Sequence, residues 1–288
     1  MEIFLGKLEL VMQKKNIDKI DDLAFFKENG YLVKKKLIPM NDIEKVLKSI
    51  NNIVRDQLKI LKLDSSDKLD SNLKNLFNND VNVYKKTLSN IWRLQSISFL
   101  LGIEKLTDYV KKTFKFKDII LPGGHVFHLQ SKSLKIPDGY FGFDAHQDYN
   151  SVNGSLDGLI LWIPLNKVDN YNYPIEFIPE SHKNGLLSTI KDKKNNIILD
   201  PSHYKDKDFI SVDLDAGDII FLSYFTIHRS KNSGKETNIR YSLSTRFDNS
   251  SESSFIKRIY PTAYIRSVDK NITKDSMPSL SDIKKIFD

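Results

Sequence analysis

Two histidines and one aspartate in this sequence could share a metal ion. His146 and Asp148 stand two positions apart, and His228 follows much later in the chain. If residues 143–149 form a strand, residues i and i+2 project from the same face, so one imidazole and one carboxylate lie side by side. Two histidines and one carboxylate on one face of an octahedron form the site of non-heme Fe(II) oxygenases. The pattern therefore predicts an Fe(II) site whose other positions stay open for O2 and a chelating cosubstrate.

The chain contains no cysteine, which excludes disulfides, thiolate nucleophiles, iron–sulfur clusters and cysteine-ligated zinc. Any metal must then be bound by His, Asp or Glu. The available histidines are His125, His128, His146, His182, His203 and His228. We expect His182 to order its own turn and His203 to be exposed in a Lys-rich loop. His125 and His128 are three apart on a predicted strand and face opposite sides, so one of them could reach the site without binding iron.

An arginine downstream of His228 suits the far end of a dicarboxylate. Arg240 lies twelve positions after His228, and its planar guanidinium can bind a carboxylate through two hydrogen bonds. Ser242, two residues further on, would share that face of a strand and could add a hydroxyl. The chain order of His-X-Asp, distal His and then Arg is what a 2-oxoglutarate site requires. We therefore expect 2-oxoglutarate as the cosubstrate.

The formal net charge of +7 raises the question of a nucleic-acid partner. The 44 Lys and Arg residues are nearly all Lys, and they are interleaved with Asp, Glu and Asn, as in residues 183–196. A nucleic-acid surface usually gathers basic residues in one stripe and often uses Arg. We therefore expect no nucleic-acid partner, although an oxygenase that modifies nucleic acid is kept as an alternative. The charge is compatible with an anionic small-molecule substrate.

The two halves of the sequence differ in periodicity. Apolar residues recur at helical spacing over 21–29, 43–54 and 94–114, which predicts a mainly helical first half. The polar segment 62–80 is expected to be a loop or irregular. From about residue 119, apolar runs of strand length are separated by Gly, Pro, Asn and Asp. The predicted strands are 124–130, 158–164, 175–179, 218–223 and 241–247. A last helix is expected over 279–287.

Short strands with turn signals between them predict an antiparallel sandwich or barrel with helical flanks. No alternating strand–helix pattern indicates a doubly wound sheet. We expect one domain over 1–288, made of a mostly helical scaffold to about residue 115, a β core over about 116–262 and a C-terminal extension over 263–288.

Nothing in the sequence directs the chain to a membrane. No segment approaches the ~18 apolar residues of a membrane span. Glu2 and Glu9 interrupt the apolar N-terminus, which lacks the charged-then-apolar pattern of a signal peptide. We therefore expect a cytoplasmic protein, and the oligomeric state is left open.

A series of motifs runs along the chain in a fixed order, from about residue 22 to residue 247. The motifs are a Phe…Gly-Tyr-hydrophobic opening at 25–33, a turn at 135–139, His146-Gln147-Asp148, the strand 158–165, a Pro-Glu-Ser-His turn at 179–182, Ala216-Gly217-Asp218, His228 with Ser230, and Arg240 with Ser242. In this order they resemble the phytanoyl-CoA dioxygenase family of Fe(II)/2-oxoglutarate oxygenases. One departure is Glu180, where the family has a Gly that suits a tight turn.

The resemblance implies a double-stranded β-helix, which is a distorted, cupin-like jelly roll. It also implies roles for particular residues: His146, Asp148 and His228 as iron ligands, Arg240 as the 2-oxoglutarate anchor, Ser230 or Ser242 as its helpers, and Trp162 as a pocket-lining residue. The implied reaction is hydroxylation of a small or medium-sized metabolite with O2, while 2-oxoglutarate becomes succinate and CO2. Asp148 favours hydroxylation, because halogenating relatives have a small residue there and leave the position to a halide.

Some assignments stay open. Further residues that could contact cosubstrate or substrate are Gln130, Lys132, Lys135 and Arg246. Arg246 shares a face with Arg240 by strand spacing and could contact an anionic substrate or the carboxylate of Asp248. The substrate itself is not identified, although a sugar, a phosphonate or a biosynthetic intermediate would fit. The alternative function is a non-catalytic jelly-roll protein that binds a metal or ligand without turnover.

Overall fold

The computed structural model describes residues 21–136, 141–191, 197–263 and 277–288. Three sequence predictions fall wholly or partly outside these ranges. They are the absence of a signal peptide at the N-terminus, the turn at 135–139 and the C-terminal extension 263–288.

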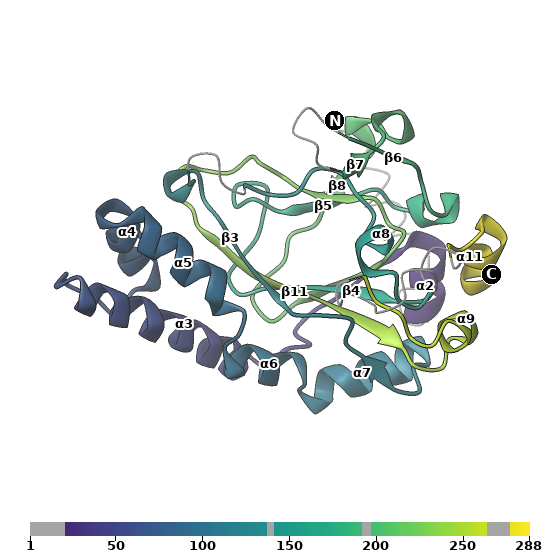
Figure 1. The fold of residues 1–288 in the computed structure, drawn as a ribbon, viewed down its shortest axis with the longest axis horizontal. Coiled ribbons are helices and arrows are strands. Elements are labelled where there is room, and N and C mark those ends of the chain that lie inside the picture. The colour runs from purple at the N-terminus through teal and green to yellow at the C-terminus, as the bar shows by residue number, and fades with distance from the viewer. Residues whose placement is uncertain (1–20, 137–140, 192–196, 264–276) are drawn as a thin grey trace.

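Helices of the first half, apart from the first of them, form a scaffold along one side of the molecule, whereas that first helix lies beside the C-terminal helix (Figure 1). Their bounds are α2 (Asp22–Asn29), α3 (Met40–Ile60), α4 (Leu69–Asn79), α5 (Val81–Ile91), α6 (Gln95–Leu101) and α7 (Glu104–Phe114). Apolar residues of α3 recur at helical spacing, and Ile43, Val46 and Ile50 are fully buried. In Figure 1, α3, α6 and α7 run beneath the large sheet, so their apolar faces cover it.

Two antiparallel sheets make up the second half. The large sheet has the strand order β1-β9-β4-β11-β2, with β3 also paired to β11, and the small sheet has the order β10-β5-β8. The strands of these sheets are β1 (Tyr31–Lys34), β2 (Ile119–Ile120), β3 (Val126–Gln130), β4 (Leu159–Pro164), β5 (Ile175–Phe177), β8 (Ile210–Ser211), β9 (Ile219–Ser223), β10 (His228–Ser230) and β11 (Arg240–Asn249). A separate hairpin is formed by β6 (Thr189–Lys191) and β7 (Ile197–Leu199). β1 comes from the helical half and joins the large sheet beside β9.

Strand β4 shows how the large sheet separates two cores. Leu159, Leu161 and Ile163 pack against the helical scaffold on one face. Ile160 and Trp162 point to the other face and pack toward the small sheet. Because both faces are covered, every residue of β4 is buried and the strand is apolar throughout instead of alternating.

The expectation of an irregular segment over 62–80 is wrong for its second part, which is helix α4. Leu73 and Leu76 are fully buried in the core shared with the other helices. The polar residue Asn72 is buried as well, and its Nδ2 donates to the Oδ1 of Asn51 on α3 at 2.8 Å. Tertiary packing and this satisfied polar contact stabilise a helix that its Asn- and Asp-rich composition does not indicate.

The expected last helix is present as α11 (Leu280–Phe287). Ser279 caps it, because its hydroxyl accepts from the Asp282 backbone while the Asp282 carboxylate accepts from the Ser279 N–H at 3.0 Å. Ile283 is fully buried and packs in the core that lies between the sheets. The helix thus covers one end of that core.

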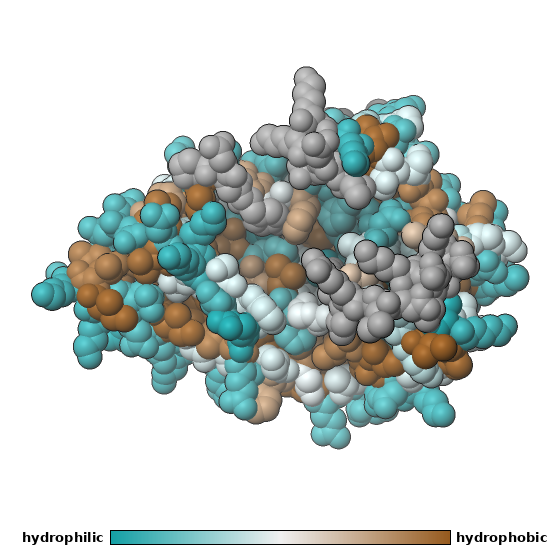
Figure 2. Space-filling view, viewed as in Figure 1, coloured by the Kyte–Doolittle hydropathy of each residue, from teal (hydrophilic) through white to brown (hydrophobic). Residues whose placement is uncertain are grey.

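The visible surface is mostly hydrophilic (Figure 2). Hydrophilic residues spread over helices and sheets alike, with apolar residues scattered between them. This agrees with the interleaving of Lys with Asp, Glu and Asn along the sequence.

Within the described ranges, none of the helices combines the length and apolar character needed to cross a bilayer.

A buried carboxylate lies near the end of β11. Asp248 is 0% exposed, and the backbone N–H of Ser155 donates to its Oδ1 at 2.9 Å. Burial raises the pKa of Asp248 to about 7, because leaving water disfavours the charged form. The folded state therefore binds this proton more tightly than the unfolded chain does. The resulting stability is present below about pH 4 and is lost as the pH rises to about 7.

Asp248→Asn should remove this pH dependence, because an amide keeps an acceptor for Ser155 and does not ionise. The free energy of unfolding of the variant, relative to wild type, should rise by up to about 4 kcal/mol between about pH 4 and pH 7 and then stay constant. Urea unfolding in pH steps measures the difference. Asp213→Asn, which removes an exposed carboxylate, is the control. Parallel pH profiles for wild type and Asp248→Asn would contradict the raised pKa.

Candidate active site

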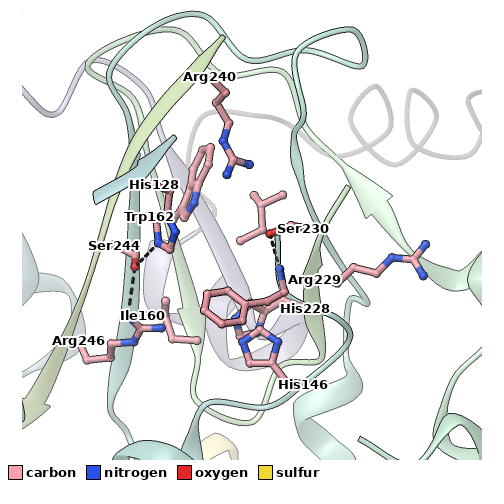
Figure 3. Close-up of a pocket in the computed structure, with 12 residues that line it drawn as sticks. His128, His146, Ile160, Trp162, His228, Arg229, Ser230, Arg240, Ser244 and Arg246 are labelled. Atoms are coloured by element: carbon pink, nitrogen blue, oxygen red, sulfur yellow. Dashed lines mark hydrogen bonds between the residues drawn. The ribbon is translucent and has the colours of Figure 1, made fainter. Parts of the chain in front are cut away.

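A pocket lies between the large and the small sheet (Figure 3). It is lined by His128, Phe143, His146, Ile160, Trp162, Ile175, His228, Arg229, Ser230, Arg240, Ser244 and Arg246. The large sheet contributes the residues of β3, β4 and β11, and the small sheet those of β5 and β10. Imidazole and guanidinium groups therefore face a space whose other walls are apolar side chains and two serine hydroxyls.

The backbone holds His146 and His228 side by side. The N–H of each residue donates to the carbonyl of the other, at 3.0 and 3.1 Å, and the ring centroids lie 4.2 Å apart. Nδ1 of His146 lies 2.7 Å from the carbonyl of Asp144, and Nδ1 of His228 lies 3.0 Å from that of Thr226. Because a carbonyl only accepts, each Nδ1 carries the proton. Each Nε2 then presents the lone pair that binds a metal.

Asp148 supplies the third candidate donor, but not from a strand. Its backbone is helical (φ −74°, ψ −25°) because it directly precedes α8 (Tyr149–Val152). The strand expected over 143–149 is therefore wrong, apart from the bridge at His146. The turn still brings Oδ1 to 3.4 Å from Nε2 of His146 and 3.8 Å from Nε2 of His228. Donors in adjacent positions around one ion at about 2.1 Å lie about 3 Å apart, so these three atoms can share an ion.

The second oxygen of Asp148 contacts Arg246. The Nε of Arg246 donates to Oδ2 at 2.8 Å. The sequence analysis left Arg246 with two possible partners, an anionic substrate or the carboxylate of Asp248, and did not include Asp148. Burial favours the neutral form of Asp148, but Arg246 and then the two histidines outweigh it and hold the pKa of Asp148 well below its usual value. The carboxylate is therefore charged.

His228 is a neutral imidazole. Burial, reinforced by the neighbouring His146, lowers the pKa of His228 to about 3. At neutral pH its Nε2 is thus unprotonated, which is the state that a metal ligand needs.

His125 and His128 face opposite sides of their strand, as their spacing predicts. Nε2 of His128 lies 2.9 Å from Oγ of Ser244 inside the pocket, whereas Nδ1 of His125 lies 3.0 Å from Oγ1 of Thr245 on the other face. Burial, with nearby guanidinium groups, lowers the pKa of His128 to about 3. His128 is therefore a neutral wall residue of the pocket, apart from the His-Asp-His group.

Arg240 points into the pocket from the large sheet (Figure 3). It is 2% exposed, its NH1 donates to the carbonyl of Tyr173 at 2.6 Å, and its guanidinium carbon lies 5.4 Å from the ring centre of Trp162. The carbonyl contact and the cation–π contact hold the planar fork in one orientation. An oriented cation of this kind can bind a carboxylate that enters the pocket.

The other polar candidates lie at different places. Ser242 is fully buried on β11, and in the described part of the chain its Oγ has no hydrogen-bond partner. Ser230 lines the pocket, and its Oγ accepts from the backbone N–H of Phe143 at 3.1 Å. Gln130 is 1% exposed and its Nε2 donates to Asn232 at 2.9 Å, so its side chain is engaged beside the pocket rather than in its wall.

Several remaining candidates lie away from the metal donors. Lys132 and Lys135 are exposed. His182 is buried, and its Nε2 lies 2.8 Å from the carbonyl of Lys27 at the end of α2. His203 is exposed. These positions agree with a structural role for His182 and with solvent exposure for His203.

The structure adds pocket residues that the sequence analysis missed. Ser244 could have been found, because it shares the even-numbered face of β11 with Arg240 and Arg246. Phe143 and Ile175 come from a loop and from the small sheet, where no periodic pattern marks them.

The residues present fit Fe(II) and 2-oxoglutarate. Two imidazole nitrogens and one carboxylate oxygen converge, and all three lie within 4.8 Å of one another. This mixed N/O set suits Fe(II). The buried hydroxyl of Ser242 lacks a partner among the described residues, which suits a polar ligand beside Arg240. These features together could hold a metal and a carboxylate cosubstrate.

Comparisons with known proteins agree with this site. The pattern of the phytanoyl-CoA dioxygenase (PhyH) family matches residues 26–237. A phytanoyl-CoA dioxygenase from Arabidopsis thaliana is 38% identical over 102 residues, which are 34% of this chain and 36% of that protein. The match therefore spans about a third of the plant protein's length.

Solved structures share the fold. The apo form of the non-heme monooxygenase ThoJ superposes with a TM-score of 0.56 at 11% identity, covering 93% of this chain and 97% of that one. EctD from S. alaskensis, solved with 2-oxoglutarate and 5-hydroxyectoine, gives a TM-score of 0.53 at 13% identity, covering 83% and 79%. These likenesses confirm the jelly-roll prediction. With the family match over most of its length, the chain belongs to the phytanoyl-CoA dioxygenase family of Fe(II)/2-oxoglutarate-dependent oxygenases.

Proposed function

We propose that this protein is an Fe(II)- and 2-oxoglutarate-dependent hydroxylase of a small or medium-sized, anionic metabolite. The convergence of the two Nε2 atoms with Oδ1 of Asp148 is the observation that carries the proposal. Membership of the family supports the reaction class. The net charge of +7 supports an anionic substrate.

Fe(II), 2-oxoglutarate and O2 together supply the oxidising chemistry, in which 2-oxoglutarate becomes succinate and CO2 while one oxygen atom enters a C–H bond of the substrate. The chain would hold three donors on one face and leave the other positions open. His146 and His228 are already oriented by the carbonyls that bind their Nδ1 atoms. Little reorganisation is then needed when the metal binds.

Arg240 would anchor the far carboxylate of 2-oxoglutarate, with Ser242 adding a hydroxyl. The contacts of Arg240 with Tyr173 and Trp162 fix its orientation, so little freedom is lost when the cosubstrate binds. The pocket is buried, and charges interact more strongly there than in water.

Apolar side chains would exclude water from the reacting atoms. Ile160, Trp162 and Ile175 are buried in the pocket wall. Phe143 is 48% exposed, and its ring centre lies 5.5 Å from that of His146. A substrate would therefore approach the metal past Phe143.

His228→Ala should abolish substrate-coupled succinate formation, because it removes a metal donor. Fe(II) affinity should fall by more than about 100-fold, since losing even a partner behind a ligand costs about 10–100-fold. Succinate release across a panel of anionic metabolites and anaerobic Fe(II) titration measure the two effects. His203→Ala, which removes an exposed histidine that contacts Ser188, should behave as wild type.

Two negative results together would favour the non-catalytic alternative. The first is succinate formation no greater than that of His228→Ala with every substrate. The second is the lack of a charge-transfer absorption band when 2-oxoglutarate is added to the Fe(II) protein without O2.

Arg240→Gln should raise the KM for 2-oxoglutarate by about 10–100-fold, which corresponds to the about 1.5–3 kcal/mol of a hydrogen bond to a charged group. The value of kcat at saturating 2-oxoglutarate should change less, because the variant leaves the metal donors in place. Arg93→Gln, which removes an exposed arginine of the helical scaffold, is the matched control. An unchanged KM would mean that the dicarboxylate is bound by another residue.

A further inference from the structure

Arg246 lies unusually close to the candidate metal site for a cation. Its Nε is 2.8 Å from Oδ2 of Asp148, and the two side chains are only 11% and 2% exposed. A buried guanidinium beside a divalent ion repels that ion, and the low dielectric strengthens the repulsion. This electrostatic cost must be offset by another effect of the Arg246–Asp148 contact.

The contact divides the two oxygens of Asp148 between two partners. Oδ1 faces Nε2 of His146 and of His228, whereas Oδ2 accepts from Arg246. A carboxylate can bind a metal through one oxygen or through both. With Oδ2 engaged by a charged donor, only Oδ1 is presented to the ion. The position that a second oxygen would occupy then stays open.

Arg246 is itself held by the large sheet. Its NH1 donates to Oγ of Ser244 at 3.1 Å, and the same Oγ lies 2.9 Å from Nε2 of His128 on β3. Asp148, in contrast, follows the bridge to the small sheet and begins a short helix. The Arg246–Asp148 contact therefore ties a ligand from an irregular segment to the rigid strand that also carries Arg240.

We propose that Arg246 is a positioning residue for the metal. It fixes Asp148 as a monodentate ligand, which binds through one oxygen, and so keeps a coordination position open for 2-oxoglutarate or O2. The inference rests on the iron site of the proposed function and extends it to a residue that need not touch iron, cosubstrate or substrate.

Removing Arg246 has two physical effects of opposite sign on metal affinity. Loss of the positive charge reduces repulsion and by itself tightens metal binding. Loss of the hydrogen bond frees Asp148 to turn, and removing such a partner costs about 10–100-fold in affinity. If Arg246 positions Asp148, the second effect dominates, and the less positive variant binds the metal more weakly.

Co(II) is a suitable probe, because it is stable in air-free buffer and its visible spectrum depends on coordination. Arg246→Met should lower Co(II) affinity by about 10–100-fold and change the spectrum, since the freed carboxylate can bind through both oxygens. Arg246→Lys keeps the charge but not the planar fork, so its Co(II) affinity should lie between those of wild type and Arg246→Met. Calorimetric titration and visible absorption measure these effects without turnover.

Arg229→Met is the matched control. Arg229 also lines the pocket and neighbours His228, but it binds Glu176 and Asp206 instead of Asp148. This variant loses the same charge and should keep the wild-type Co(II) spectrum. Ser244→Ala removes the hydroxyl that supports NH1 of Arg246 and also contacts His128. It should shift affinity in the same direction by a smaller factor, which keeps the test usable if Arg246→Met does not fold.

Other results would overturn the inference. Co(II) binding by Arg246→Met that is as tight as wild type, with an unchanged spectrum, would overturn the inference. So would an equal loss in Arg229→Met, because pocket charge and not the Asp148 contact would then be the cause. Wild-type protein that binds Co(II) no better than His228→Ala would overturn the proposed iron site, and the inference with it.

Discussion

The candidate active site depends on the antiparallel backbone pairing of His146 with His228. Two mutual hydrogen bonds fix segments that are far apart in the sequence, and paired residues of antiparallel strands project on the same side. In both histidines, Nδ1 contacts the carbonyl of the residue two positions earlier, Asp144 or Thr226. The same local geometry thus sets both tautomers, and the metal donors are arranged by the backbone before any ion binds.

The two sheets divide the chemistry between them. The small sheet and its bridge supply the imidazoles of His228 and His146, while the large sheet supplies the guanidinium groups of Arg240 and Arg246 from one face of β11. The opposite face of β11 carries Tyr241, Leu243 and Phe247, which pack against the helices. The helical scaffold therefore matters to function, because burying the outer face of this strand makes the inner face rigid. A rigid cationic face opposite a metal site suits a bound dicarboxylate.

Apolar runs of strand length were sufficient to predict an antiparallel sandwich or barrel, and the ordered motifs, through their resemblance to a known family, implied the jelly roll. Helix α4 was missed, because its stability comes from contacts such as that of Asn72 with Asn51 and not from composition. Strand spacing correctly predicted that Asp148 lies beside His146. A turn and not a strand, however, brings Asp148 to the histidines. For Arg246, spacing gave the correct face but did not indicate Asp148 as a partner. Periodicity states which side of a strand a residue faces, but not which distant segment covers that side.

The difference between regular and irregular segments explains why the sequence indicates the reaction class but not the substrate. The candidate donors His146 and His228 and the candidate anchor Arg240 lie in paired segments, where spacing constrains geometry, although Asp148 lies in a turn. Phe143, an exposed residue of the pocket lining, comes from an irregular segment and is held there by hydrogen bonds to Ser230 rather than by a repeating pattern. Such segments can change length and sequence without disturbing the strands that hold the metal donors. Substrate choice can therefore diverge within this fold while the donor set and its supporting arginines are kept.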